Sequence, residues 1–320
     1  MPSVHGIHHI TAIAGAPQLN LDFYTRTLGL RLVKRTVNFD DPYTYHFYFG
    51  NADGEPGTIL TFFPWGGDSL HGRIGTGQVS VTGFSVPSGS MNYWIERLAT
   101  HDVPFDGPDA RFDDHVLTLR DPDGIALELI GTARDARASW ANGEISAEHA
   151  IRGFHHATLS LVGFERTAEL LTGPLGFRPV GESHNRYRFA CGDGAPGTMI
   201  DLLCEPDRAR GAMGVGVVHH IAFRIGGDQD QLALRETLGA QGRDVTPVMD
   251  RQYFRSIYFR EPGGVLFEIA TDPPGFAIDE APAELGMHLK LPPWLESHRG
   301  KIEARVAPIQ LARSNNPSSR

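Results

Sequence analysis

The sequence predicts an α+β fold in which one βαβββ module is repeated four times. Four apolar segments of similar pattern pass through residues 9, 81, 156 and 220, between 64 and 75 residues apart in a chain of 320 residues. Each is followed by a segment of helical character, and then by a turn and a second apolar segment. Self-similarity at a fixed period indicates a repeated supersecondary unit, so the repeat decides the fold class.

The first strand of each module supplies the clearest sign of the repeat. Three of these strands, in GIHHITAI, GFHHATLSL and VVHHIAFRI, contain adjacent histidines, which are His8–His9, His155–His156 and His219–His220. The fourth segment, QVSVTGFSV at 78–86, has the same shape without histidine. Aligning Phe84 with Phe223 places Val81 opposite His220.

The remaining elements follow in a fixed order within each module. Helical segments are expected at 21–33, 91–105, 164–180 and 230–245, and closing strands at 55–65, 121–130, 195–206 and 261–272. A Pro-Gly or Pro-Asp turn begins each closing segment, because proline presets φ and glycine tolerates positive φ. The polar segment 132–153 indicates a linker. The expected domains are 1–143, with two modules, and 150–320, with two modules and a C-terminal extension.

The composition is that of an ordinary globular protein, with 41% hydrophobic and 21% charged residues. A net charge of −9 argues against nucleic acid or an anionic membrane as a partner. No apolar stretch reaches the ~20 residues that span a bilayer, and the first residues lack the pattern of a signal peptide. Because Cys191 and Cys204 cannot form a disulfide framework, we expect reduced thiols and a cytoplasmic protein; a homo-oligomer is left open.

Strand alternation predicts which histidine of each pair faces a common site. Neighbouring residues on a strand point to opposite faces. His219 shares its face with the apolar Ile221 and Phe223, whereas His220 lies on the more open face, and Glu268 also points away from its apolar neighbours. The alternation therefore predicts one face with His9, Thr11, His156, His220 and Glu268, and the opposite face for His8, His155 and His219.

His220 and Glu268 form the best candidate for a metal half-site, because a buried carboxylate on an apolar strand is costly unless it is paired or bound to a metal. The positions equivalent to Glu268 in the other modules are Phe62, Glu128 and Leu202. Modules one and four would combine His9 with His220 and Glu268, and modules three and four would use His156 instead of His9. Modules two and three contribute only Glu128 and His156, so one metal per chain is expected. Two histidines and one carboxylate with open positions are typical of non-haem Fe(II) oxygenases, and Zn²⁺ is an alternative in principle.

The modular organisation resembles the vicinal oxygen chelate superfamily, and within it the ring-cleaving dioxygenases of the hydroquinone and chlorohydroquinone group. The resemblance covers residues 5–293 and rests on segments such as LVKRTVNFDDP, YHFYFGNADGEPGT, DRQYFRSIYFREPGGVLFE and GMHLKLPP. It implies four modules paired into two open, barrel-like sheets. It also implies that iron, as Fe(II) with Mn(II) as an alternative, is bound by His9, His220 and Glu268. The pocket residues that it implies are His8, Thr11, His219, Arg251 and Tyr258.

The expected function is cleavage of a hydroquinone-type ring, substituted or chlorinated, by O₂, with Arg251 and Tyr258 stabilising charge and moving protons. A glyoxalase-like lyase would need a second carboxylate where this chain has Phe62 or Leu202. One rival is a catechol-type extradiol dioxygenase that uses His156 in place of His9, and another is a non-catalytic module that binds an aromatic compound or a drug. The remaining polar residues are interpreted as structural remnants of the repeat or surface groups: Glu128, His156, His46 and His115.

Overall fold

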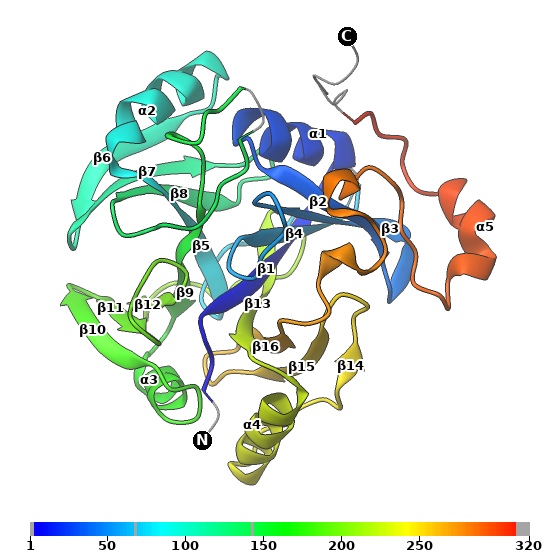
Figure 1. Cartoon of the computed structure of the whole chain (residues 1–320). Helices are drawn as coiled ribbons and strands as arrows, with labels where there is room; N and C mark the ends of the chain where they lie inside the picture. The colour runs from blue at the N-terminus through cyan, green and yellow to red at the C-terminus, as the bar shows by residue number, and fades with distance from the viewer. Residues whose placement is uncertain (1–2, 67–68, 142–143, 312–320) are drawn as a thin grey trace.

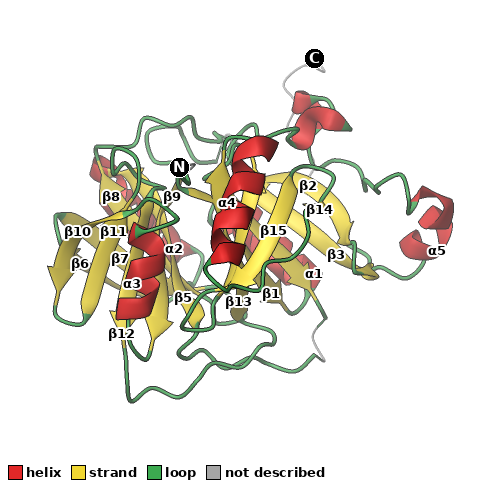
Figure 2. Ribbon diagram, turned by 90° about the horizontal axis from the view of Figure 1, so that it is seen from below, coloured by secondary structure: helices red, strands yellow, loops and turns green. Residues whose placement is uncertain are grey.

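Two curled sheets of eight strands make up the body of the protein in a computed structural model, which describes residues 3–66, 69–141 and 144–311. The sheets lie side by side, and the short helices lie around their outer sides (Figures 1 and 2). The predicted α+β class, with two open, barrel-like sheets, is confirmed.

The four modules follow the predicted order of strand, helix and three strands. Module one comprises β1 (Ile7–Ala14), α1 (Pro17–Asp22), which a π-helical turn (Phe23–Thr27) continues, β2 (Arg31–Asn38), β3 (Asp41–Gly50) and β4 (Ile59–Pro64). Module two comprises β5 (Gln78–Pro87), a 3₁₀ turn (Ser88–Ser90), α2 (Met91–Thr100), β6 (Phe105–Arg111), β7 (Asp114–Arg120) and β8 (Ala126–Thr132). Module three comprises β9 (Gly153–Leu161), α3 (Glu165–Thr172), β10 (Arg178–Ser183), β11 (Arg186–Ala190) and β12 (Met199–Cys204). Module four comprises β13 (Val217–Ile225), α4 (Asp228–Ala240), β14 (Met249–Asp250), β15 (Arg255–Arg260) and β16 (Leu266–Thr271).

Each sheet combines one module from the first half of the chain with one from the second half. The strand order of the first sheet is β14-β15-β16-β13-β1-β4-β3-β2, so modules one and four share it. The order of the second sheet is β10-β11-β12-β9-β5-β8-β7-β6, so modules two and three share that one. The domain division at 1–143 and 150–320 stays a prediction about the chain, and the sheets join modules across it.

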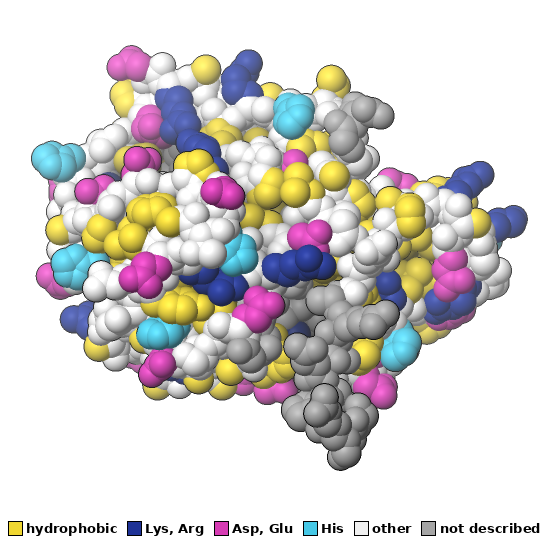
Figure 3. All heavy atoms as spheres, turned by 90° about the horizontal axis from the view of Figure 1, so that it is seen from above, with side chains coloured by type: hydrophobic (Ala, Val, Ile, Leu, Met, Phe, Trp, Pro, Cys, Tyr) yellow, Lys and Arg dark blue, Asp and Glu magenta, His cyan; other side chains and the backbone are white. Residues whose placement is uncertain are grey.

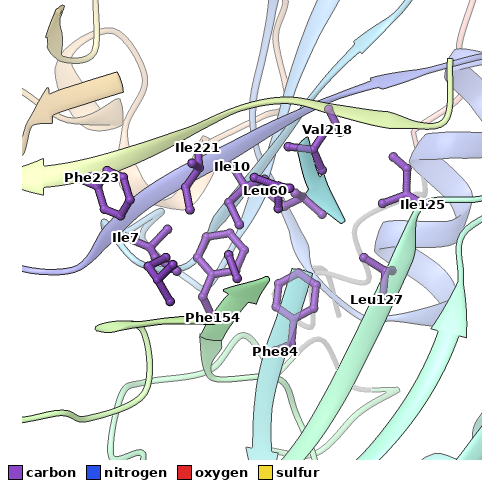
Figure 4. Packing of buried hydrophobic residues seen from close by; sticks show 14 of the residues in the cluster. Ile7, Ile10, Leu60, Phe84, Ile125, Leu127, Phe154, Val218, Ile221 and Phe223 are labelled. Atoms are coloured by element: carbon purple, nitrogen blue, oxygen red, sulfur yellow. The ribbon is translucent and has the colours of Figure 1, made fainter. Parts of the chain in front are cut away.

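One continuous apolar core lies between the two sheets. Ile10, Ile221 and Phe223 from the first sheet meet Phe84 and Phe154 from the second, and all five are fully buried (Figure 4). Burying a side chain of this size stabilises the fold by about 1.5–3 kcal/mol. Because these side chains occupy one face of β1 and β13, the other face of the same strands is available for a site.

The paired histidines of the first sheet coincide with β-bulges. The register passes from Ile7↔Phe223 to His9↔Ala222, and from Thr11↔His220 to Ala12↔Val218. His8 and His219 are therefore extra residues without a direct partner across the ladder. A bulge re-aims the side chain of its extra residue, and His219 lines the same cavity as His220. The prediction that His219 faces away from His220 is wrong for this reason.

The C-terminal extension wraps the edge of the first sheet and contains 3₁₀ turns at Phe276–Ile278, Pro282–Glu284 and Glu296–His298 and the helix α5 (Arg299–Glu303) (Figure 1). It is tied to β2 by Lys34, a fully buried cation whose Nζ lies 2.6 Å from Asp279 Oδ1 and also contacts Glu280. Trp294 of the extension packs edge-on against Phe39, with 5.6 Å between ring centroids.

Acidic and basic side chains are interspersed on the face shown in Figure 3, so that face offers no electrostatic footprint for a polyanion. In the part of the chain that the structure describes, no helix is long and apolar enough to cross a lipid bilayer.

Candidate metal centre

Three side chains from β1, β13 and β16 converge on the free face of the first sheet. Glu268 Oε2 lies 2.9 Å from His220 Nε2 and 3.2 Å from His9 Nε2, and the two Nε2 atoms are 3.4 Å apart. All three residues are buried. Within residues 3–66, 69–141 and 144–311, they are the only three His, Cys, Asp or Glu residues whose ligand atoms all lie within 4.8 Å of one another.

The triangle of ligand atoms fits a divalent metal ion. Two ligands about 2.1 Å from an ion and at right angles to each other are about 3.0 Å apart, close to the three distances found. Burial raises the pKa of the Glu268 carboxyl, but the charges and hydrogen bonds of His9 and His220 outweigh burial and hold the pKa well below its usual range. Among the described residues, the only polar atoms beside Glu268 Oε2 are the two Nε2 atoms, and neither makes a hydrogen bond of good geometry with it, so a cation held between the three atoms would compensate this buried anionic oxygen.

Each candidate ligand is held through its other polar atom. His8 Nδ1 lies 2.9 Å from His9 Nδ1, and His219 Nδ1 lies 2.7 Å from His220 Nδ1. Ser256, fully buried on β15, donates a hydrogen bond to Glu268 Oε1. These contacts leave Nε2 of His9, Nε2 of His220 and Oε2 of Glu268 for the metal. Partners of this kind orient ligands and tune their basicity, so the bulge residue of each pair supports the ligand that follows it.

The three ligand atoms open into a cavity of about 420 Å³. This volume is within the range of small-molecule sites, about 300–1,000 Å³. Aromatic and aliphatic side chains form much of the wall, namely Phe39, Phe63, Trp65, Met249, Phe254 and Leu266. The shape and polarity of the wall suit a flat apolar ring.

Arg251 and Tyr258 form the polar side of the cavity. Arg251 Nε donates a hydrogen bond to Tyr258 Oη at 3.0 Å, and Arg251 Nη1 lies 3.3 Å from Asp40 Oδ2. Tyr258 faces Glu268 across the β15–β16 ladder. Burial, followed by the charge of Glu268, raises the pKa of Tyr258, so the phenol keeps its proton. A phenol that accepts from a guanidinium is free to donate its own proton to a ligand.

The structure brings most of the sequence-predicted site residues to one place. Thr11, His219, Arg251 and Tyr258 line the cavity together with the three candidate ligands. His8 is buried behind His9 and packs against Phe254, with 5.0 Å between ring centroids.

Sequence reasoning missed part of the cavity wall, including two residues of β3. His46, interpreted from the sequence as a remnant or surface group, lines the cavity with Tyr48, whereas His115 is exposed as expected. His46 and Tyr48 are two positions apart on β3 and therefore share a face. This spacing indicates a site only once β3 is known to lie in the same sheet as His9.

Charged pairs occupy the equivalent position of the second sheet. His156 Nε2 lies 3.3 Å from Glu128 Oε2 and 3.6 Å from Asp201 Oδ2. Arg111 Nη1 binds both oxygens of Glu128, at 2.7 and 2.8 Å, and two further arginines, Arg186 and Arg188, pair with Asp201.

The register shows why the second sheet lacks the third ligand. Val81 lies opposite Thr158 in the second sheet, as His220 lies opposite Thr11 in the first. The second sheet therefore carries a neutralised charge network where the first carries its three candidate ligands, and His156 is outside the convergent group.

The chain belongs to the Glyoxalase/Bleomycin resistance protein/Dioxygenase superfamily, whose family model matches residues 6–129 and 153–269. It is 49% identical over 308 residues to MhqO of Bacillus subtilis (strain 168), which is named as a proposed ring-cleaving dioxygenase; the match covers 96% of this chain and 97% of that protein. It is 36% identical over 307 residues to a chlorohydroquinone/hydroquinone 1,2-dioxygenase of Sphingobium indicum, covering 93% and 95% of the two chains. The resemblance inferred from the sequence segments is thereby confirmed.

Solved structures support the same fold. The crystal structure of a proposed dioxygenase from Bacillus subtilis matches with a TM-score of 0.94 at 47% identity, over 98% of this chain and 99% of that one. Glyoxalase I from Zea mays matches with a TM-score of 0.63 at 15% identity, over 83% and 92% of the two chains. The second likeness concerns the fold alone.

Proposed function

We propose that this chain is an Fe(II)-dependent dioxygenase that uses O₂ to cleave the ring of hydroquinone-type substrates, including substituted or chlorinated ones. The observation that carries the proposal is the group of His9, His220 and Glu268 at an aromatic cavity. Two histidines and one carboxylate with open positions are typical of non-haem Fe(II) oxygenases, and Mn(II) is the alternative metal. The names of the two relatives, a ring-cleaving and a hydroquinone dioxygenase, support the reaction class.

The three ligand atoms would hold the metal, and Fe(II) would supply the Lewis-acid and redox chemistry that lets O₂ react with an aromatic ring. The apolar wall binds the ring and excludes water. Arg251 places a positive charge beside the cavity, which stabilises a phenolate oxygen of the substrate. Tyr258, held by Arg251, donates its phenol proton to a second oxygen.

His219 is a further proton-transfer group in this proposal. When Nε2 of His220 is a ligand, its Nδ1 carries the hydrogen and donates to His219 Nδ1, 2.7 Å away. His219 then carries its own hydrogen on Nε2. Burial, with the neighbouring His220 second, lowers the pKa of His219 to about 3, so the ring is neutral. Because His219 lines the cavity, its Nε2–H is a donor toward a bound reactant.

We also infer a cytoplasmic location. Cys191 and Cys204 are both free thiols, and burial raises the pKa of Cys191 to about 11, so this thiol stays protonated and unreactive. Free thiols of this kind are typical of a reducing compartment.

The test is anaerobic loading of the metal-free protein with Fe(II), followed by O₂ uptake with hydroquinone, methylhydroquinone and catechol in parallel. His9→Ala and His156→Ala are a matched pair, because both residues are the second histidine of a pair on equivalent strands. We expect His9→Ala to lose iron and O₂ uptake, and His156→Ala to keep iron when folded. The reverse result would support the catechol-type ligand set. An iron-loaded protein that binds diphenols without O₂ uptake would refute the dioxygenase and favour a binding module.

A further inference from the structure

A chain of hydrogen bonds runs through the wall of the cavity behind the candidate ligands. Tyr48 Oη lies 2.9 Å from His46 Nδ1, and His46 Nε2 lies 2.8 Å from Thr61 Oγ1. Thr61 Oγ1 donates to Thr11 Oγ1 at 2.8 Å. The four residues lie on β3, β4 and β1, which are adjacent strands of the first sheet, and Thr11, Thr61 and Tyr48 are buried. The proposed dioxygenase reaction described above assigns no role to His46, Thr61 or Tyr48.

The direction of donation along this chain follows from Tyr48. Its buried phenol has only His46 Nδ1 as a hydrogen-bond partner among the described residues, so we assign the phenol proton to that bond. Burial, followed by the charges of His9 and His220, lowers the pKa of His46 well below its usual range, so the ring is neutral and its one hydrogen lies on Nε2. Nε2 then donates to Thr61 Oγ1, and the single hydroxyl proton of Thr61 is left for Thr11.

Tyr48 can hold the chain in this direction because its phenol stays protonated. Burial, followed by the charges of Tyr258 and Glu268, raises the pKa of Tyr48 well above its usual value. Among the described residues, Tyr48 Oη has no hydrogen-bond partner other than His46.

The far end of the chain is a hydroxyl proton at the metal centre. Thr11 accepts from Thr61, and no other described residue accepts the proton of Thr11. Thr11 lies two residues after His9, hence on the same face of β1, and directly opposite His220 in the ladder. Because Thr11 lines the cavity, its proton is available to an atom bound beside both histidine ligands.

We propose that His46 is a positioning residue that, acting through Thr61, fixes the Thr11 hydroxyl as a hydrogen-bond donor toward the reactant oxygen held at the metal centre. The inference rests on the proposed function for the identity of that oxygen. The direction of the hydrogen bonds from Tyr48 to Thr11 does not depend on the proposed function. Because Thr61 donates to the Thr11 hydroxyl, Thr11 cannot donate back to Thr61, and its own proton is directed away from Thr61 before the reactant binds. Preorganised donors of this kind stabilise negative charge that develops in a transition state.

The first measurement is the tautomer of His46, read from its ring ¹⁵N chemical shifts in the metal-free or zinc-loaded protein. We expect a neutral ring with the hydrogen on Nε2. Tyr48→Phe removes the donor that keeps Nδ1 as an acceptor, so we expect this variant to gain the Nδ1–H form. A wild-type ring with the hydrogen on Nδ1 would overturn the proposal, as would a Tyr48→Phe ring that is unchanged.

The second measurement separates the hydroxyl of Thr61 from its volume. Thr61→Val keeps the shape and breaks the chain, so we expect kcat with a para-diphenol to fall about tenfold while KM and iron affinity change little. Thr61→Ser restores the hydroxyl and is expected to stay within about threefold of the wild type. Thr82→Val is the matched control, because Thr82 is equally buried on β5 and its hydroxyl has no hydrogen-bond partner among the described residues.

The outcomes distinguish this proposal from the proposed function. Full kcat in Thr61→Val, or equal losses in the Val and Ser variants, would overturn the role of the chain in a working dioxygenase. An iron-loaded wild type without O₂ uptake would refute the proposed function, and the His46 tautomer would then still decide whether the chain has the stated direction.

Discussion

The charge network of the second sheet predicts a stability that depends on pH in a defined window. Glu128 is buried between Arg111, which binds both of its oxygens, and His156. Burial raises the pKa of the Glu128 carboxyl, but the hydrogen bond and charge of His156, and then Arg111, outweigh burial and lower the pKa from 4.5 to about 2. Because the pKa is lower in the folded state, ionised Glu128 stabilises the fold above pH 4.5, and this contribution is lost as the pH falls toward 2.

The magnitude follows from the two pKa values. A difference of about 2.5 between them, at about 1.4 kcal/mol per pKa unit, corresponds to about 3 kcal/mol at pH 7. At pH 3.5 the carboxyl is still ionised in the folded state but mostly protonated in the unfolded state. The same relation then gives a contribution of about 2 kcal/mol. Glu128→Gln removes the titration and keeps the shape, so the difference in unfolding free energy between wild type and variant should shrink by about 1 kcal/mol over this range.

The assay is urea unfolding at pH 7, 5, 4 and 3.5 for the wild type and for Glu128→Gln. Glu182→Gln is the control, because Glu182 is exposed on β10 of the same sheet and its loss should leave the unfolding free energy unchanged. A wild-type-minus-variant difference that is constant from pH 7 to 3.5 would refute the reasoning. A difference that grows as the pH falls would contradict the sign of the pKa change.

Three further predictions concern single contacts. Ser256→Ala removes the hydrogen bond to Glu268 Oε1, and we expect iron affinity in a chelator competition to fall about 10–100-fold. The exposed Ser297→Ala is the control, and equal iron affinities in the two variants would contradict an orienting role of Ser256. Lys34→Met leaves the carboxylates of Asp279 and Glu280 without their buried cation, so the unfolding free energy in urea should fall by about 3–5 kcal/mol. A loss no greater than that of the exposed Lys301→Met would contradict a stabilising role of these ion pairs. Arg251→Lys keeps the charge but loses the Nε donor to Tyr258, and we expect kcat to fall about tenfold; an unchanged kcat would exclude Tyr258 positioning by Arg251.

The ligand set shows how far local patterns reach. The histidine pairs and the repeated turns align the modules and single out Glu268 and its equivalent Glu128 without knowledge of any contact. In the other two modules the alignment is wrong by one residue, because the sheet register places Thr61 and Asp201, not Phe62 and Leu202, at the equivalent position. Strand alternation then places His220 and Glu268 on one face, which the structure bears out by bringing their ligand atoms to 2.9 Å. These features are encoded within single strands, whose period of two is a local property of the backbone.

His219 shows where the same reasoning fails. Alternation assumes an uninterrupted ladder, and the extra residue in β13 breaks that assumption at the histidine pair. A bulge depends on how two strands pair, so the sequence of one strand cannot predict it. Asp201 was missed for a related reason, because the alignment pointed to Leu202, and only the packing of β11 against β12 shows Asp201 between Arg186 and Arg188.

The sequence by itself determined the four modules, the α+β class, and the residue types of the candidate ligands, because each of these follows from periodicity and spacing along the chain. It left His9 and His156 as alternatives, since both occupy the same position of equivalent strands. Tertiary structure places His9, and not His156, beside His220 and Glu268, because β1 pairs with β13 and β5 pairs with β9. Which strand edges join is set by packing over the whole apolar core between the sheets, a sum over many distant contacts that no local pattern contains.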